Sequence, residues 1–189
     1  MRQSAGQPKP THADAYQGVP RPVGAMAHDL PPAFEIPWHS HPRYQLIFAV
    51  RGVMLIDTRE ATWLVPPQRA VWMPPKTAHR VRTSTAVGMR TLYIRPAAVK
   101  RMPKTCEVFE VTPLLRELIL RATELPMEYD ERGPAGRVMR LLRALGWIAE
   151  GRPIVEVALE LGYESPSAFS AMFRRELGVP PSHFRGPAA

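Results

Sequence analysis

Two short amphipathic patterns flank Gly162 near the end of the chain. Apolar residues recur three or four positions apart in each pattern, which is the spacing of one face of an α-helix. Glycine tolerates the left-handed backbone that a sharp turn needs. The two patterns therefore predict a helix-turn-helix. The first contains Ile154, Val157, Ala158 and Leu161, and the second contains Phe169, Met172, Phe173 and Leu177.

The second predicted helix has a start signal and a polar face. Ser165 is suited to cap its N-terminus, and Pro166 to occupy its first position. The polar face carries short donors and arginines, which suit the major groove of DNA and its phosphates. Amphipathic helices around a glycine also occur in domains that touch no DNA, so the pattern alone leaves both interpretations open. The candidate DNA-binding residues are Ser165, Ser167, Ser170, Arg174 and Arg175.

Short β-type runs with Pro and Gly between them dominate the first half of the chain. Many short strands divided by turn residues predict an antiparallel barrel or jelly roll. Together with the helical patterns that follow, they predict an α+β fold, in which an N-terminal β-barrel precedes a small all-α domain. The runs cover residues 44–50, 53–57, 62–65, 70–73, 79–82 and 89–94.

Residues that can bind a metal gather in and around these runs. His39 and His41 are two positions apart, so both point to the same face of a strand, and Gln45 follows on that face. His79 would come from a neighbouring strand. Three imidazoles and one oxygen donor inside a barrel form a candidate site for a divalent metal. The alternative is a small-molecule effector pocket that the same residues line without a metal.

The rest of the chain divides where the composition changes. The N-terminal stretch is rich in Pro, Gly, Gln and Ala without apolar periodicity, and we expect a mobile arm. A helix capped by Thr112 packs either on its own barrel or against its counterpart in a dimer. The expected segments are the arm at 1–32, the barrel at 33–105, this helix within 106–127, a polar linker at 128–136 and the helix-turn-helix domain at 137–189.

The composition indicates which kind of partner the protein binds and in which cellular compartment it acts. The formal net charge is +8 and the pI is about 10.2, which favour an anionic partner, either a nucleic acid or an acidic membrane. A single cysteine excludes an internal disulfide framework and fits a reducing compartment. No apolar run approaches the length of a membrane span, and the N-terminus lacks the apolar core of a signal peptide. We expect a cytoplasmic protein with no membrane partner.

A long motif runs through the C-terminal segment as Ile154-x-Glu156-Val157-Ala158, Leu161-Gly162-Tyr163, Ser165-x-Ser167-x-Phe169, Phe173-Arg174-Arg175 and Gly178-x-x-Pro181-x-x-Phe184-Arg185. It resembles the second helix-turn-helix of the AraC/XylS family of bacterial transcription regulators. The resemblance implies that the helix at about 166–177 reads base edges in double-stranded DNA. It also implies a long preceding helix, for which the apolar stripe is Val138, Leu141, Leu142, Leu145 and Ile148.

Members of that family carry two helix-turn-helix units, whereas this chain has room for one after the linker. The domain is therefore shortened. A single recognition helix makes fewer phosphate contacts, so its affinity for DNA falls by orders of magnitude. A homodimer would recover part of this affinity by placing two recognition helices on adjacent half-sites.

The histidine pattern resembles the cupin signature across roughly residues 34–95. In that signature a His-x-His pair, a glutamate and a later histidine hold a metal, which His39, His41, Gln45 and His79 match with two departures. Gln45 stands in place of the glutamate, which removes a negative charge. Lys76 replaces the glycine of the second motif, which raises the question of whether the turn before His79 is kept.

These observations lead to one main hypothesis and two alternatives. The main one is a transcription regulator, not an enzyme, in which the barrel senses an unidentified effector and the C-terminal helices bind DNA. The first alternative is a small cupin metalloenzyme, although no general base is evident beyond the candidate ligands. The second is a partner that does not bind DNA and forms mixed dimers with a full-length regulator.

Overall fold

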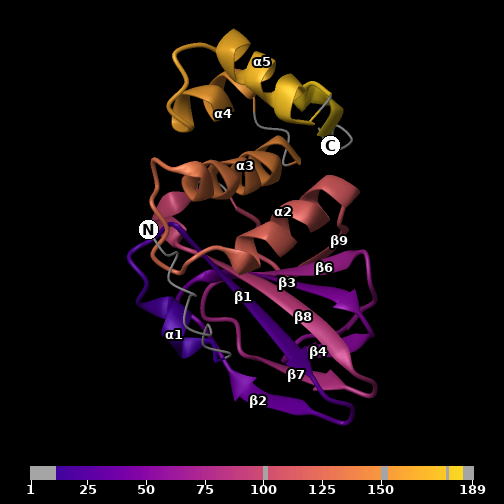
Figure 1. Ribbon diagram of the computed structural model, residues 1–189. Helices are drawn as coiled ribbons and strands as arrows, with labels where there is room; N and C mark the ends of the chain where they lie inside the picture. Colours follow the sequence, from indigo (N-terminus) through magenta and orange to yellow (C-terminus); the bar gives the residue numbers. More distant parts are fainter. Residues whose placement is uncertain (1–11, 100–101, 150–152, 178, 185–189) are drawn as a thin grey trace, which may run out of the picture. The chain divides into compact units, whose positions relative to one another are not determined.

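The computed structural model describes residues 12–99, 102–149, 153–177 and 179–184. They form two compact units, Met1–Ala135 and Gly136–Ala189. The first unit is built on two β-sheets, and the second consists of helices (Figure 1). The predicted α+β class, with an antiparallel β-domain before a helical one, is confirmed. Among the described residues, no helix combines the length and the apolar character needed to cross a membrane.

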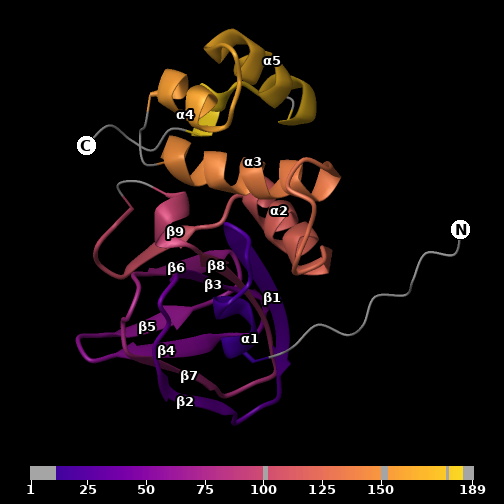
Figure 2. The ribbon, with the colours of Figure 1, turned by 90° about the vertical axis from the view of Figure 1, so that its left-hand side faces the viewer.

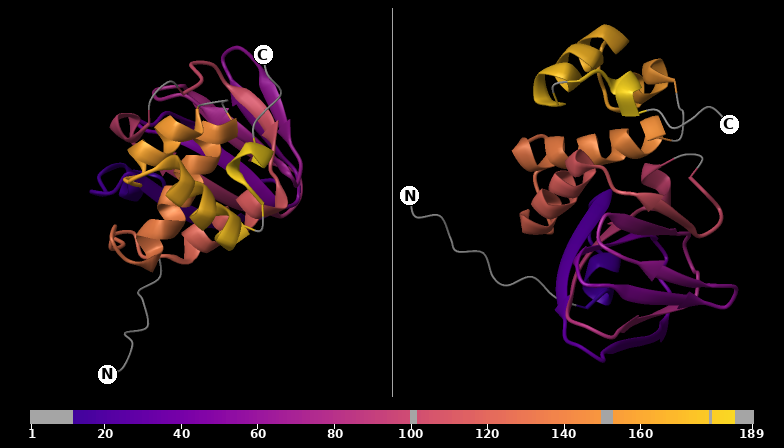
Figure 3. Two further views of the ribbon diagram at one scale, coloured as in Figure 1. Left: turned by 90° about the horizontal axis from the view of Figure 1, so that it is seen from above. Right: turned by 90° about the vertical axis from the view of Figure 1, so that its right-hand side faces the viewer.

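The strands of the first unit pair antiparallel in two sheets, as in a jelly roll. The sheets have strand orders β1-β8-β3-β6-β9 and β2-β7-β4-β5, and they lie face to face (Figures 2 and 3). Each of the six predicted runs is a strand, with ends that differ by at most two residues. The bounds are β1 Val23–Leu30, β2 Glu35–His39, β3 Tyr44–Arg51, β4 Met54–Thr58, β5 Thr62–Val65, β6 Arg69–Met73, β7 His79–Thr83, β8 Val87–Ile94 and β9 Glu107–Glu110.

Apolar side chains fill the space between the sheets. Along β4, Met54 and Ile56 are fully buried while Leu55 between them is partly exposed. This alternation is the period of a strand with one face in the core. Methionines also pack in this core, including Met26 and Met89, where flexible thioethers fill irregular gaps. The packed core fixes the position of one sheet on the other. It thereby also fixes the strand ends that carry His39 and His79.

The prediction of a mobile arm at residues 1–32 is wrong from Asp14 onward, and residues 1–11 lie outside the described ranges. Residues Asp14–Gln17 form the short helix α1, and β1 is an edge strand of the larger sheet. Tyr16 is fully buried and packs on Tyr93 with ring centroids 5.8 Å apart. A Cβ at Gly24 would lie 3.3 Å from Tyr16, so the glycine that suggested disorder permits this close packing.

Two arginines explain why the segment before β1 is ordered. The guanidinium of Arg43 donates to the carbonyls of Gln17, Val19 and Arg21, and Arg95 donates to the Val19 carbonyl at 2.9 Å. Arg43 is 3% exposed, so these carbonyls replace the water that a buried guanidinium would otherwise lose. The backbone of this segment is therefore held by tertiary contacts that no local sequence pattern reveals.

The helix predicted after Thr112 is α2, Pro113–Glu124. The Thr112 side chain accepts from the Leu115 N–H at 3.3 Å, which confirms the predicted cap. The helix contacts β1 and β8 and buries Ile119 against its own unit, as Figure 2 shows for the sheet beneath it. These contacts match the alternative in which the helix covers its own barrel, and its packing against a counterpart in a dimer stays a prediction. Strand β9 was not predicted; it pairs with β6, and its sequence Glu-Val-Phe-Glu lacks the polar/apolar alternation of a strand.

The second unit contains α3 Pro134–Ala149, α4 Ile154–Glu160, α5 Pro166–Leu177 and the 3-10 turn η2 Pro181–Phe184. Helix α3 begins inside the predicted linker, because Pro134 suits a first helical position. Of its predicted apolar stripe, Leu142 is buried, whereas Val138 and Leu141 are partly exposed. Met139, which the stripe omitted, is also buried. The side chains of Leu145 and Ile148 lie outside the described residues.

A charged network ties three strands of the smaller sheet together on its outer face. The carboxylate of Asp57 on β4 accepts from Arg80 at 2.8 Å, from Arg82 at 2.7 and 3.0 Å, and from the Thr62 hydroxyl at 2.8 Å. The Asp57 side chain is 7% exposed. These donors, led by Arg82, hold the pKa of Asp57 far below its usual range. A carboxylate with a depressed pKa stabilises the fold above its unfolded pKa, and this contribution is lost as the pH falls toward the folded value.

We expect Asp57→Asn to lower the free energy of unfolding at pH 7 by about 1–2 kcal/mol, since the half-exposed arginines screen part of the interaction. The difference from the native chain should shrink when the pH is lowered below about 3.9, the ordinary pKa of an aspartate, because the Asp57 carboxyl of the unfolded chain then binds a proton while the folded carboxyl stays ionised. Urea unfolding at pH 7 and at pH 3 measures both values.

The matched control is Asp29→Asn, which removes a carboxylate that also pairs with two arginines but is 58% exposed. Exposed ion pairs contribute about 0–1 kcal/mol, so this variant should lose clearly less than Asp57→Asn. Equal losses for the two variants at pH 7 would show that the Asp57 network is no stronger than a surface pair.

Candidate functional site

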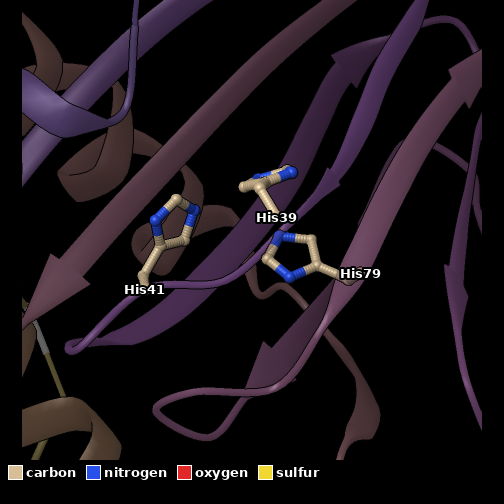
Figure 4. A group of neighbouring side chains, drawn as sticks. All are labelled: His39, His41 and His79. Atoms are coloured by element: carbon tan, nitrogen blue, oxygen red, sulfur yellow. The ribbon is translucent and has the colours of Figure 1, made fainter.

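The histidines His39, His41 and His79 converge at one end of the barrel (Figure 4). His39 ends β2 and pairs directly with His79 at the start of β7, while His41 lies in the following loop rather than on the strand. One ligand atom from each residue lies within 4.8 Å of the others. His41 and His79 are 4% and 1% exposed, and His39 is half-buried. The structure thus brings together the three histidines that the spacing suggested.

Backbone carbonyls fix the orientation of two of these rings. The Nδ1 atom of His39 lies 2.7 Å from the Pro37 carbonyl, and that of His79 lies 2.9 Å from the Thr77 carbonyl. A carbonyl only accepts, so Nδ1 of each ring carries a hydrogen, and in the neutral ring Nε2 keeps a lone pair. Neither ring nitrogen of His41 has a partner among the described residues. Burial lowers the pKa of His41 and of His79 to about 4, so both are neutral at pH 7.

Gln45 lies on β3 and is 4% exposed. Its amide nitrogen donates to the Thr91 hydroxyl and to the Tyr93 hydroxyl, both at 3.3 Å. Its carbonyl oxygen has no partner within the described ranges. The Tyr93 ring contacts the ring of His41 with centroids 5.1 Å apart, which places Gln45 in the polar network beside the histidines.

The turn before His79 is kept although a lysine replaces the glycine of the cupin pattern. Lys76 adopts a left-handed backbone with φ 65°, and its N–H donates to the His41 carbonyl at 2.6 Å. A non-glycine residue in this region costs on the order of 1 kcal/mol, which the surrounding structure must offset. This hydrogen bond links the loops of His41 and His79, so the departure from the pattern leaves the cluster assembled.

The arrangement offers lone pairs and few donors. Neutral imidazoles suit first-row divalent metals, and ligating histidines usually donate their other N–H to a carbonyl or carboxylate, as His39 and His79 do. The unpartnered carbonyl oxygen of buried Gln45 is a further acceptor in the same barrel. The residues therefore fit a metal. The same set would also bind a polar organic molecule that donates hydrogen bonds.

Helices α4 and α5 form the predicted helix-turn-helix in the second unit. Gly162 has φ 80°, and the N–H of Tyr163 donates to the Ala158 carbonyl at 3.0 Å, which closes the turn. Phe169 and Phe173 are both fully buried, with ring centroids 5.4 Å apart, and Phe169 also contacts the ring of Tyr163. The buried face predicted for α5 is confirmed at these residues. The side chain of Leu177 and the motif residues Gly178 and Arg185 lie outside the described residues.

Four of the candidate DNA-binding residues lie on α5, and Ser165 directly precedes the helix. The Ser165 hydroxyl accepts from the Ala168 N–H at 3.1 Å, which confirms the predicted cap and leaves the hydroxyl hydrogen free to donate. Ser167, Arg174 and Arg175 are exposed, and Ser170 is half-buried. The exposed positions Ala168 and Ala171 were not among the predicted DNA-binding residues. Their small apolar side chains gave no chemical signal, although helical spacing places Ala171 beside Ser167 and Arg174.

Comparisons with known proteins show what this chain is similar to. The family model of the AraC-like ligand binding domain matches residues 25–160, and a helix-turn-helix domain model matches residues 135–186. The chain is 27% identical to the HTH-type transcriptional regulator NimR of Escherichia coli over 223 residues, covering 78% of this chain and 81% of NimR. A crystal structure of ToxT from Vibrio cholerae covers 86% of this chain and 94% of its own with 10% identity and a TM-score of 0.44. A cupin-2 protein from Shewanella frigidimarina covers 39% of this chain and 72% of its own, at 13% identity and a TM-score of 0.36.

The match over residues 25–160 defines a ligand-binding regulator class, and the chain belongs to the family of the AraC-like ligand binding domain. It is an AraC-type helix-turn-helix transcriptional regulator with an N-terminal cupin-like domain, as the sequence predicted. The alignment with NimR spans 223 positions, more than the 189 residues of this chain. Within the aligned region, NimR therefore has residues with no counterpart in this chain.

We expect the purified chain to bind one Zn²⁺ or Ni²⁺ ion at the histidine cluster. His79→Ala should reduce the affinity by at least about tenfold, because it removes one of the three imidazole ligands. Isothermal titration measures the stoichiometry and the affinity, and thermal unfolding with and without metal measures the same binding as a shift in Tm.

The control is His28→Ala, which removes a histidine of β1 that does not belong to the cluster. It should bind metal like the native chain. If metal binding by the native chain and by His79→Ala were the same, the cluster would not be a metal site, and the organic-ligand interpretation would remain.

Proposed function

We propose that this chain acts in the cytoplasm as a homodimer that binds double-stranded DNA through α5 and changes this binding when the histidine cluster takes up its effector. The observation that carries the proposal is the division of α5 into a fully buried side and an exposed side with arginines. Phe169 and Phe173 occupy the first, and Ser167, Arg174 and Arg175 lie on the second. A helix presented in this way on a glycine turn matches the arrangement that enters a major groove.

Each candidate residue takes a role that its position allows. Arg174 and Arg175 contact phosphates near the end of the helix, where long cationic side chains reach the DNA backbone. Ser167 and Ser170 donate to base edges or to backbone oxygens. Ser165 caps the helix and directs its hydroxyl hydrogen to a phosphate oxygen.

A dimer follows from the small size of the DNA-binding domain. One recognition helix makes few phosphate contacts, and affinity for DNA depends steeply on their number. Two copies of the chain would place two such helices on adjacent half-sites, which multiplies the affinity without new contacts. The second candidate is a chain that does not bind DNA itself and forms mixed dimers with a longer relative, whose DNA binding it weakens. The residues of NimR that have no counterpart in this chain favour this alternative.

The first effector to test is a divalent first-row metal at His39, His41 and His79, with Gln45 as a neutral fourth neighbour. A metal would link β2, the His41 loop and β7, so its binding would stiffen this end of the barrel. The second class is a small organic effector in the same place without a metal. We assign no catalytic step to these residues, because their proposed role is to bind a ligand whose presence changes DNA binding.

We expect the double variant Arg174→Ala, Arg175→Ala to weaken binding to every DNA sequence and to reduce the slope of log affinity against log salt by about 1 unit per arginine. The cause is the loss of two phosphate contacts and of the counterions that they release. Fluorescence anisotropy with labelled duplex DNA at several salt concentrations measures the slope.

The matched control is Arg121→Ala, which removes an arginine that is 61% exposed on α2, in the other unit. Its slope should equal that of the native chain. If the slope of the double variant were also unchanged, α5 would not be the element that grips DNA, and this assignment of the interface would fail.

A further inference from the structure

Ala171 lies at the centre of the exposed side of α5. It is two residues from both Phe169 and Phe173, which is about 200° around an α-helix from each, so it points away from the buried side. Ala171 is itself exposed, and Ser167 and Arg174 flank it one turn before and one turn after. The centre of the exposed side of α5 is therefore an alanine, with polar residues around it.

An alanine at this position has a definite chemical consequence in a major groove. Its methyl group neither donates nor accepts hydrogen bonds, so it gains nothing from the polar edges of guanine, cytosine or adenine. The C5-methyl of thymine is the one apolar group on that surface, and alanine is among the residues that contact it. The short side chain also lets the helix backbone approach closely enough for the two methyl groups to meet.

We infer that Ala171 is a specificity-determining residue that selects an A·T pair through the thymine methyl group. The inference rests on the proposed function, because it requires α5 to lie in the major groove. Ser165 does not contact the thymine methyl group in this arrangement, since its hydroxyl oxygen accepts from the Ala168 N–H as the helix cap. Arg174 and Arg175 set affinity through phosphate, whereas Ala171 adds sequence preference at one base pair.

The experiment starts by selecting duplexes from a random-sequence DNA pool with the full chain. Each thymine of the enriched sequence is then replaced singly by deoxyuridine, which keeps base pairing and removes only the C5-methyl. At one position in each half-site, we expect this replacement to weaken binding by the native chain about fourfold, the effect of losing one buried methyl-sized contact. The Ala171→Gly variant should bind the thymine and deoxyuridine duplexes equally at that position.

The ratio of the two affinities is measured with one protein at a time, so any loss of stability caused by glycine in the helix cancels. The Ala171→Ser variant, which retains more helix propensity, should also lose the ratio. Ser167→Gly serves as the control on the same face and should keep it.

The outcomes separate the inference from the function on which it depends. If no sequence is enriched from the pool, the proposed DNA-binding function fails, and the inference fails with it. If a sequence is enriched but no deoxyuridine replacement changes affinity, only the role of Ala171 is overturned. An effect of deoxyuridine that persists in Ala171→Gly would likewise show that another residue contacts the methyl group.

Discussion

The burial of Phe169 and Phe173 determines which side of α5 faces outward, and the DNA-binding account depends on it. The two rings pack on each other and on Tyr163, which follows the turn at Gly162. Because these contacts fix the rotation of the helix, Arg174 and Ala171 are exposed as a consequence. Removing a fully buried phenylalanine costs about 3–5 kcal/mol, more than a small helical unit is expected to tolerate, so this surface and the stability of the unit are linked.

In the barrel, backbone groups assemble a site whose side chains come from separate loops. The carbonyls of Pro37 and Thr77 orient two imidazoles, and the left-handed turn at Lys76 ties the loops of His41 and His79 together. The site carries no carboxylate among the described ligand set, since Gln45 replaces the usual glutamate and gives its N–H groups to Thr91 and Tyr93. A neutral site of this kind binds a dication more weakly than a charged one, which suits a sensor that must release its ligand.

Periodicity and turn residues were sufficient to predict most elements. The caps at Thr112 and Ser165 and the turn at Gly162 have local causes, and each was found from the sequence. The fixed position of Tyr16 could not be predicted, because it depends on long-range contacts of Arg43 with backbone carbonyls and on space left by Gly24. The histidine cluster was predicted from spacing, but the loop position of His41 was not. Strand β2 ends at His39, which pairs with His79 on β7, and spacing alone does not show where this pairing stops.

The most direct test of the account is the ratio of affinities of the full chain for a DNA duplex selected from a random pool and for the same duplex with its sequence shuffled, at physiological salt. Reading of base edges by α5 predicts a preference of at least about 10³, the lower end for specific DNA-binding proteins. Electrostatic attraction of a chain with net charge +8 would bind both duplexes alike. Equal affinities would therefore contradict the claim that the exposed side of α5 reads DNA sequence.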